Sequence, residues 1–246
     1  MFFMNELRSW YEGAAYFRET EIFFRDCDEK KRLRLSVLLS FFVDNAGKDY
    51  TGKGWSHDNM LRYRQAFLLS RIRVRIAKLP RIDDIVTVYT CERDIKGPLF
   101  IRDYALYEKK GDALACGTSD WLLIDTEKRR ILRPSDFHGT ASKNEKIVDC
   151  PDCEKLSIRE SGLELAAERK ILRSDLDANG HLYSARYADI VLDCVDAADI
   201  KEFEINYKKE ILRDQTVSLF SGTENEKISV LGKTGETVNF ICRLGM

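Results

Sequence analysis

The chain has 246 residues, of which 44% are hydrophobic and 33% are charged, and its formal net charge is −1. This length and composition are typical of a soluble globular protein with one large or two small domains. The small net charge excludes a protein that coats nucleic acid or anionic membrane with its whole surface. The apolar stretches, such as 37–43, are far shorter than the roughly 20 residues that a membrane span needs.

The cysteines and the first residues indicate a compartment. MFFMNELRSWYEG lacks a basic segment followed by an apolar one, so we expect no secretory signal and a cytoplasmic protein. Seven scattered cysteines fit a reducing environment better than a disulfide framework. Cys150 and Cys153 form a CxxC pair, which can bind zinc or perform redox chemistry, but no second pair or nearby histidine completes a metal site. We therefore expect no metal and no cofactor.

The first half of the chain reads as a strand, a helix and then more strands. Alternating residues predict a strand over 15–26. Asp28 is a suitable N-cap for a helix over 29–46, which we expect to end at Gly47. A loop over 48–59 follows, and after it we expect strands at 66–77, 85–93, 100–109 and 114–126.

The second half repeats this order after a segment with little periodicity. Residues 133–162 hold two of the four prolines and read as a linker. Beyond it we expect a strand at 163–173, a helix at 183–198 and strands near 203–210, 215–222, 226–232 and 236–243. A long helix wrapped by an antiparallel sheet is a hotdog unit. The sequence therefore predicts an α+β tandem (double) hotdog, with an N-terminal hotdog at 1–135, a linker at 136–162 and a C-terminal hotdog at 163–246.

Two stretches support an internal repeat. Residues 25–28 precede the first helix much as residues 173–177 precede the second, and KLPRIDDIVTV from Lys78 is similar to KKEILRDQTVSL from Lys208. Matching Asp84 with Asp214 places Pro80 opposite Glu210. The two copies differ at that carboxylate, so we expect one half to be catalytic and the other to be a degenerate partner.

The residues that can carry chemistry lie in the second copy. Asp177, Asn179 and His181 occupy one short loop between a strand and a helix, and Glu210 lies at the end of a neighbouring strand. A carboxylate can activate water, an amide can hold a carbonyl and a histidine can shuttle a proton. The same loop residues also suit a plain turn and a helix cap. Glycine-rich phosphate loops, nucleophile elbows and zinc-protease motifs do not occur in the sequence.

Two segments carry a resemblance to a known family. DLDANGHLYSARY from Asp175 resembles the DLDxNxHxNNxxY motif of acyl-ACP thioesterases, and YKKEILRDQTV from Tyr207 is similar to their EYRRECxxD segment. LLSRIRVRIAKLPRIDDIVTVYT from Leu68 and SDWLLIDTEKRRILRP from Ser119 match the first half of the family. The resemblance covers about residues 13–246.

The resemblance implies a catalytic set of Asp177, Asn179, His181 and Glu210. Glu210, helped by His181, would activate water, Asn179 would orient water or thioester, and Asp177 would fix its loop partners. The sequence leaves open which residue is the base. The paired asparagines of the motif are replaced by Tyr183 and Ser184, and Ile211 replaces the cysteine after the glutamate, which argues against a cysteine nucleophile.

The resemblance also implies a substrate and a partner. The enzyme would hydrolyse the thioester of acyl-[acyl carrier protein] to a free fatty acid, with the first hotdog taking the acyl chain. An acyl-CoA thioesterase and a non-catalytic acyl-binding protein are the alternatives. Acyl carrier protein (ACP) is acidic, so we expect a basic docking surface from Arg62, Arg64, Arg71, Arg73 and Arg75, or from residues 128–130. We expect no nucleic-acid partner, no membrane span, and a monomer or homodimer.

Overall fold

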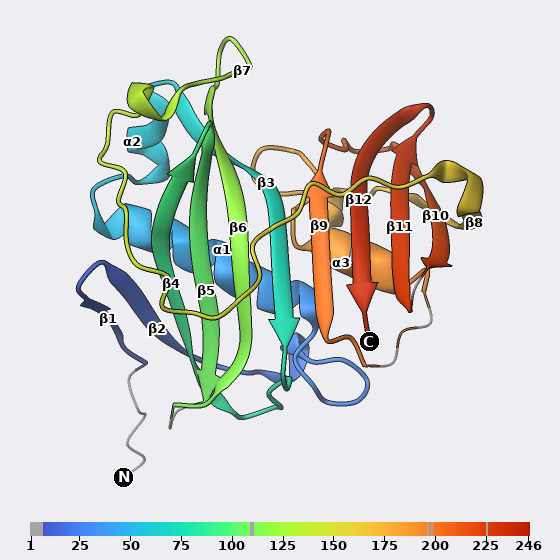
Figure 1. Cartoon of the computed structure of the whole chain (residues 1–246), viewed down its shortest axis with the longest axis horizontal. Helices are drawn as coiled ribbons and strands as arrows, with labels where there is room; N and C mark the ends of the chain where they lie inside the picture. The colour runs from blue at the N-terminus through green and yellow to red at the C-terminus, as the bar shows by residue number, and fades with distance from the viewer. Residues whose placement is uncertain (1–6, 109–110, 196, 198, 225) are drawn as a thin grey trace.

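One antiparallel sheet of twelve strands organises the whole molecule. The computed structural model describes residues 7–108, 111–195, 197, 199–224 and 226–246. Along the sheet the strands follow the order β1-β2-β4-β5-β6-β3-β9-β12-β11-β10-β8, and β7 pairs with β6. Both main helices, α1 and α3, lie against the same face of this sheet (Figure 1).

The N-terminal half wraps its strands around α1 (Leu35–Gly52). Apolar residues at helical spacing on α1, including Leu38, Leu39 and Phe42, are fully buried against the sheet. A short helix, α2 (His57–Arg62), follows α1. The strands of this half are β1 (Ser9–Glu12), β2 (Ala15–Glu21), β3 (Gln65–Ile76), β4 (Ile85–Lys96), β5 (Leu99–Glu108), β6 (Ala113–Asp125) and β7 (Arg130–Ile131).

The predicted bounds of the first helix are wrong at both ends. Asp28 does not cap α1, because its carboxylate accepts the N–H groups of Lys30 and Arg32 in a separate turn, both at 2.9 Å. The helix also continues through Gly47. The roughly 1 kcal/mol that a helical glycine costs is offset by burial of apolar helix residues such as Ala46. Of the expected loop at 48–59, residues 48–52 belong to α1 and residues 57–59 to α2, so only the stretch between them is a loop.

The C-terminal half repeats the arrangement with a shorter helix, α3 (Arg186–Leu192). The helix predicted at 183–198 begins later, because Tyr183 closes a turn in which its carbonyl accepts the N–H of Arg186 at 2.8 Å; residues 196 and 198 lie outside the described residues. The strands are β8 (Glu164–Lys170), β9 (Glu202–Tyr207), β10 (Thr216–Glu224), β11 (Lys227–Thr234) and β12 (Thr237–Gly245). With α1 and α3 each held in a curved antiparallel sheet, the fold is the expected α+β double hotdog.

The two halves join edge to edge through β3 and β9. These strands pair antiparallel from Arg71 opposite Asn206 to Arg75 opposite Glu202. Arg73 lies at the centre of the join, where its guanidinium contacts Glu154 at 2.7 Å and Glu204 at 3.7 Å. The join therefore combines a backbone ladder with a half-buried ionic cluster.

Residues 138–159, which we call the strap, cross the face of the sheet opposite the helices (Figure 1). On the N-terminal half, the amide of Asn144 donates to the carbonyl of Glu92 at 2.7 Å. On the C-terminal half, the N–H of Leu156 donates to the Asn206 side chain at 2.9 Å. The segment predicted as a linker therefore runs in contact with both hotdogs.

Candidate active site

Asp177 folds the loop that carries the candidate residues. Its Oδ1 accepts the N–H groups of Asn179 at 2.8 Å and His181 at 3.1 Å. Gly180, with φ +78°, permits the reversal at the loop tip. His181 then returns a carbonyl to the Asp177 N–H at 2.8 Å. The loop is thus a closed turn in which Asp177 fixes the backbone of His181.

Backbone contacts hold this loop against the segment that contains Glu210. His181 forms a bridge with Leu212, and the N–H of Leu182 donates to the carbonyl of Ile211 at 2.8 Å. Glu210 lies three residues after the end of β9, beyond the strand in which the sequence placed it. His181 and Glu210 are therefore brought to neighbouring backbones, whereas Asn179 lies exposed at the loop tip.

Asn239 on β12 positions the backbone around Glu210. Its carbonyl accepts the N–H of Lys208 at 2.8 Å, and its side-chain amide donates to the carbonyls of Lys209 and Glu210, both at 3.4 Å. Glu210 and Asn239 line an open pocket of about 350 Å³. The rest of its lining is Lys209, Gln215, Thr216, Thr234, Gly235 and Thr237. Sequence reasoning missed Asn239, because no local pattern links it to the loop.

The Glu210 side chain is held by a residue from the other hotdog. Its carboxylate accepts a hydrogen bond from the guanidinium of Arg129, in the turn between β6 and β7. Asp125 builds that turn by accepting the N–H groups of Glu127 at 3.0 Å and Lys128 at 2.9 Å. Arg129 has φ +50°, a left-handed conformation that costs a non-glycine residue about 1 kcal/mol. The N-terminal hotdog therefore reaches over the candidate site.

Two tyrosines complete the surroundings of the loop. Tyr187 is 3% exposed, and burial, together with the charges of Glu210 and Asp177, raises its pKa. Burial raises the pKa of Tyr183, whose hydroxyl lies near the side chains of Ser40 and Asp44 on α1. Tyr187 matches the final tyrosine of the DLDxNxHxNNxxY motif, and this match is the sequence signal that indicates it as a residue of the site. Tyr183 connects the candidate loop to the helix of the first hotdog.

The N-terminal hotdog contains the same turn without the same side chains. The Oδ1 of Asp28 accepts N–H groups two and four residues later, as Asp177 does. Arg32 bridges Arg81 as His181 bridges Leu212, and Asp83 and Asp214 both have positive φ. The predicted match of Asp84 with Asp214 is thus off by one residue. Lys30, Arg32 and Leu79 stand where the second copy has Asn179, His181 and Glu210.

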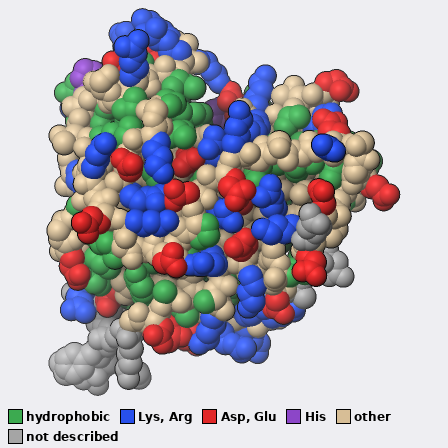
Figure 2. Space-filling model, viewed as in Figure 1, with side chains coloured by type: hydrophobic (Ala, Val, Ile, Leu, Met, Phe, Trp, Pro, Cys, Tyr) green, Lys and Arg blue, Asp and Glu red, His purple; other side chains and the backbone are tan. Residues whose placement is uncertain are grey.

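Most of the arginines proposed for docking are used inside the molecule. Arg71 pairs with Asp120 at 3.1 Å, Arg73 with Glu154, and Arg75 with Asp149 at 3.7 Å. Arg62 and Arg64 are exposed, and Arg64 contacts Glu127 at 3.0 Å. The exposed Lys128, Arg129 and Arg130 stand out at the β6–β7 turn, where Lys and Arg side chains cap the top of the view in Figure 2.

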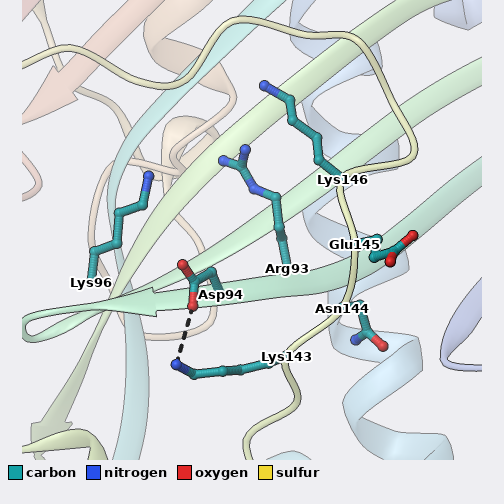
Figure 3. A pocket seen from close by; sticks show the side chains of 7 residues that line it. All are labelled: Arg93, Asp94, Lys96, Lys143, Asn144, Glu145 and Lys146. Atoms are coloured by element: carbon teal, nitrogen blue, oxygen red, sulfur yellow. Dashed lines mark ion pairs between the residues drawn. The ribbon is translucent and has the colours of Figure 1, made fainter.

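A second pocket, of about 390 Å³, lies under the strap and is rich in cations. Arg93, Lys96 and Lys146 extend their side chains towards the same region in Figure 3. All three contact the carboxylate of Asp152 in the strap, Arg93 at 2.7 Å and both lysines at 3.2 Å. These cations are already matched by a strap carboxylate, so the pocket serves to seat the strap.

The CxxC pair does not act as one unit. The Cys153 thiol donates to the carbonyl of Thr118 at 3.1 Å, whereas Cys150 packs among buried residues on the outer face of the N-terminal sheet. Within the described residues, no group of three or more His, Cys, Asp or Glu side chains could hold a metal ion.

Comparison with protein families identifies the chain. The acyl-ACP thioesterase N-terminal domain matches residues 13–137, and the C-terminal domain of the same family matches residues 162–239. The chain belongs to the acyl-ACP thioesterase family. It is a thioester hydrolase that acts on acyl-ACP and releases free fatty acid. A search of curated sequences gave no significant match.

Solved structures of acyl-ACP thioesterases share this fold. An acyl-ACP thioesterase from Bacteroides thetaiotaomicron superposes with a TM-score of 0.82 at 20% identity, over 94% of this chain and 97% of that one. The 12:0-ACP thioesterase from Umbellularia californica gives 0.79 at 17% identity, over 96% of this chain and 98% of that one. None of the helices described in this acyl-ACP thioesterase is long and apolar enough to cross a membrane.

Proposed function

We propose that this acyl-ACP thioesterase hydrolyses its substrate with Glu210 as the general base, assisted by His181. Glu210 takes a proton from a water molecule whose oxygen attacks the thioester carbonyl carbon. The tetrahedral intermediate then collapses, the C–S bond breaks, and the carrier thiolate leaves and takes up a proton. Asn179 orients the water or the thioester, and Asp177 positions His181 through the closed turn.

The observation that carries this proposal is the difference between the two copies of the turn. Asp28 and Asp177 build the same backbone, so the turn alone is a property of the fold. Only the second copy combines it with a histidine and a glutamate on adjacent backbones; the first has Arg32 and Leu79 at those places. Acid–base chemistry is therefore available at one end of the molecule and absent from its repeat.

We further propose that the carrier protein docks on the β6–β7 turn. Lys128, Arg129 and Arg130 are exposed there, and Arg129 touches Glu210. An acidic carrier bound at this turn would bring its prosthetic arm to the Glu210 pocket. Before substrate binds, Arg129 orients the Glu210 carboxylate.

The acyl chain is proposed to lie along α1 in the N-terminal hotdog. Tyr183 links the candidate loop to this helix at Ser40 and Asp44. One turn further along, the helix reaches a buried ionic cluster in which Asp49 contacts Arg102 at 2.8 Å and Lys53 at 2.9 Å. An alkyl chain gains nothing from charged groups, so this cluster is the proposed limit of the chain.

We propose that the working unit is a monomer in the cytoplasm. One chain carries both hotdogs and every residue of the proposed site, so a homodimer is not needed to complete it. All seven cysteines are free thiols, as expected for a reducing compartment.

Thiol release from matched acyl-ACP and acyl-CoA substrates tests the function and the partner together. We expect a higher kcat/KM with acyl-ACP. Reversing two charges, Lys128→Glu with Arg130→Glu, should raise KM for acyl-ACP by about tenfold at low salt and leave acyl-CoA turnover unchanged.

Lys201→Glu is the matched control, since it reverses an exposed charge just before the start of β9, at the end of the strand away from Glu210. Equal loss with both substrates would contradict docking at the β6–β7 turn. Faster turnover of acyl-CoA would keep the site and overturn the partner.

A further inference from the structure

A pair of thiols joins the strap to the sheet on the face away from the helices. Cys116 on β6 and Cys150 in the strap belong to one buried cluster, with Ala15, Tyr89, Cys91, Ala105 and Val148. Each thiol is the main influence on the pKa of the other, as expected for neighbouring groups. The Cys116 thiol also lies 3.8 Å from the carbonyl of Asp149, the residue before Cys150. Cys116 therefore lies against the backbone next to Cys150, and such proximity is the first requirement of a disulfide.

A cation beside this pair distinguishes the two sulfurs. Arg75 faces Cys116 across the β3–β6 ladder, and its guanidinium contacts the Asp149 carboxylate at 3.7 Å. The hydrogen bond from Cys150 and the charge of Arg75 lower the pKa of the Cys116 thiol, although burial opposes them. The contact with Cys116 and burial raise the pKa of Cys150. Cys116 is thus the sulfur of the pair that loses its proton more readily.

The strap is the part of this site that can open. Residues 138–159 have no helix or strand of their own. Cys150 is fully buried and Cys116 is 7% exposed, whereas Asp149, the strap residue before Cys150, is exposed. A segment held by side-chain contacts rather than a ladder opens locally more readily than the strands beneath it. We therefore expect small oxidants to reach Cys116 when the strap opens.

We infer that Cys116 and Cys150 form a redox-active dithiol that a hydroperoxide converts to a disulfide, latching the strap to the sheet. The Cys116 thiolate attacks one peroxide oxygen, the O–O bond breaks, and the leaving alkoxide takes a proton to become an alcohol. Cys150 then attacks the resulting sulfenic sulfur. The S–S bond forms, and the hydroxide that leaves takes the Cys150 proton to become water. Cys153 has no part in the reaction, because its thiol is directed to Thr118.

The test is oxidation of the intact protein with hydrogen peroxide, followed by mass spectrometry without reduction. The expected product has lost two hydrogen atoms and yields one crosslinked peptide pair that contains Cys116 and Cys150. Cys150→Ala should abolish the crosslink. Cys153→Ala, which removes one thiol from the same strap, should retain it.

Thermal unfolding gives a second measurement that does not depend on peptide recovery. The Cys116–Cys150 disulfide would close the loop of chain between β6 and the strap. It should raise the Tm by about 5–10 °C in wild type and in Cys153→Ala. The oxidised and reduced forms of Cys150→Ala should unfold at the same temperature. A Cys150–Cys153 bridge, or peroxide treatment that leaves Cys116 and Cys150 unlinked, would overturn the inference. Because the readouts are mass and Tm, they are independent of the catalytic proposal.

Discussion

Asp28 and Asp177 perform the same local task in two different settings. Each carboxylate accepts two backbone N–H groups in its own turn, and these bonds define the path of the chain into the following helix. In the first copy the turn carries Arg32, which pairs with Asp28 and Asp199. In the second it carries His181. Comparison of the two aspartates therefore separates the structural role of Asp177 from its proposed role in catalysis.

Replacing each aspartate by alanine should have similar effects on stability and different effects on turnover. Asp28→Ala and Asp177→Ala each remove two backbone hydrogen bonds, so each should lower the free energy of unfolding by about 1–2 kcal/mol. The partly exposed pair of Asp28 with Arg32 adds under about 1 kcal/mol to the first loss. Only Asp177→Ala should lower kcat, by about tenfold to a hundredfold, because only that turn positions His181. Urea unfolding and steady-state thiol release measure the two quantities. Equal kcat for the two variants would contradict a positioning role for Asp177.

At the scale of elements, the sequence predicted the order of strands and helices well, but it predicted the helix ends and the connecting segments less well. Alternation and turn residues located the long strands because each buries one face in a ladder. The end of α1 was misplaced because Gly47 is compatible with a helix when burial of apolar helix residues supports it. The sequence predicts a cap at Asp28 because an aspartate that closes a turn has the same local signature. The strap was read as a linker because its contacts lie in Glu92, Asn206 and other residues remote in sequence.

The strap makes one pH dependence measurable. Partial burial alone would raise the pKa of Asp152, but hydrogen bonds from Arg93, Lys146 and Lys96 lower it to about 2 in the folded protein, from an ordinary value of 3.8. Because the folded pKa is depressed, its contribution to stability is present above pH 4 and is lost as the pH falls towards 2. Urea unfolding across this range should show a steeper loss for wild type than for Asp152→Asn. Identical slopes would mean that the ion pairs do not stabilise the strap.

At the scale of the whole molecule, the two hotdogs share one sheet and one ionic join. Arg73 is 11% exposed and faces Glu154, Glu202 and Glu204, of which Glu204 is 4% exposed. The sequence predicted two hotdogs but not this join, because edge-to-edge pairing of β3 with β9 depends on strands far apart in the chain. Its motifs likewise made His181 and Glu210 candidates, whereas Arg129 and Asn239 lie at the candidate site only through the tertiary fold.

Removing the cation at the join should destabilise the whole molecule. Arg73→Gln removes a cation that faces the buried Glu204 carboxylate, which keeps the N–H of Glu154, and should lower the free energy of unfolding by about 3 kcal/mol. Adding Glu204→Gln should restore part of this loss. Arg213→Gln is the control, since Arg213 is 60% exposed and pairs with Asp214 on the surface, which is worth under about 1 kcal/mol. Equal losses for Arg73→Gln and Arg213→Gln would show that the ionic join contributes nothing.

The most direct test of the account is the rate at which Glu210→Gln releases thiol from acyl-ACP in a single turnover. Glutamine keeps the size of the side chain and removes the base, so the account predicts a rate reduced by about 10²–10⁴-fold with the fold intact. Glu236→Gln, at a fully exposed position in the β11–β12 turn near the same pocket, should retain the wild-type rate. Wild-type turnover by a folded Glu210→Gln enzyme would contradict the assignment of Glu210 as the base.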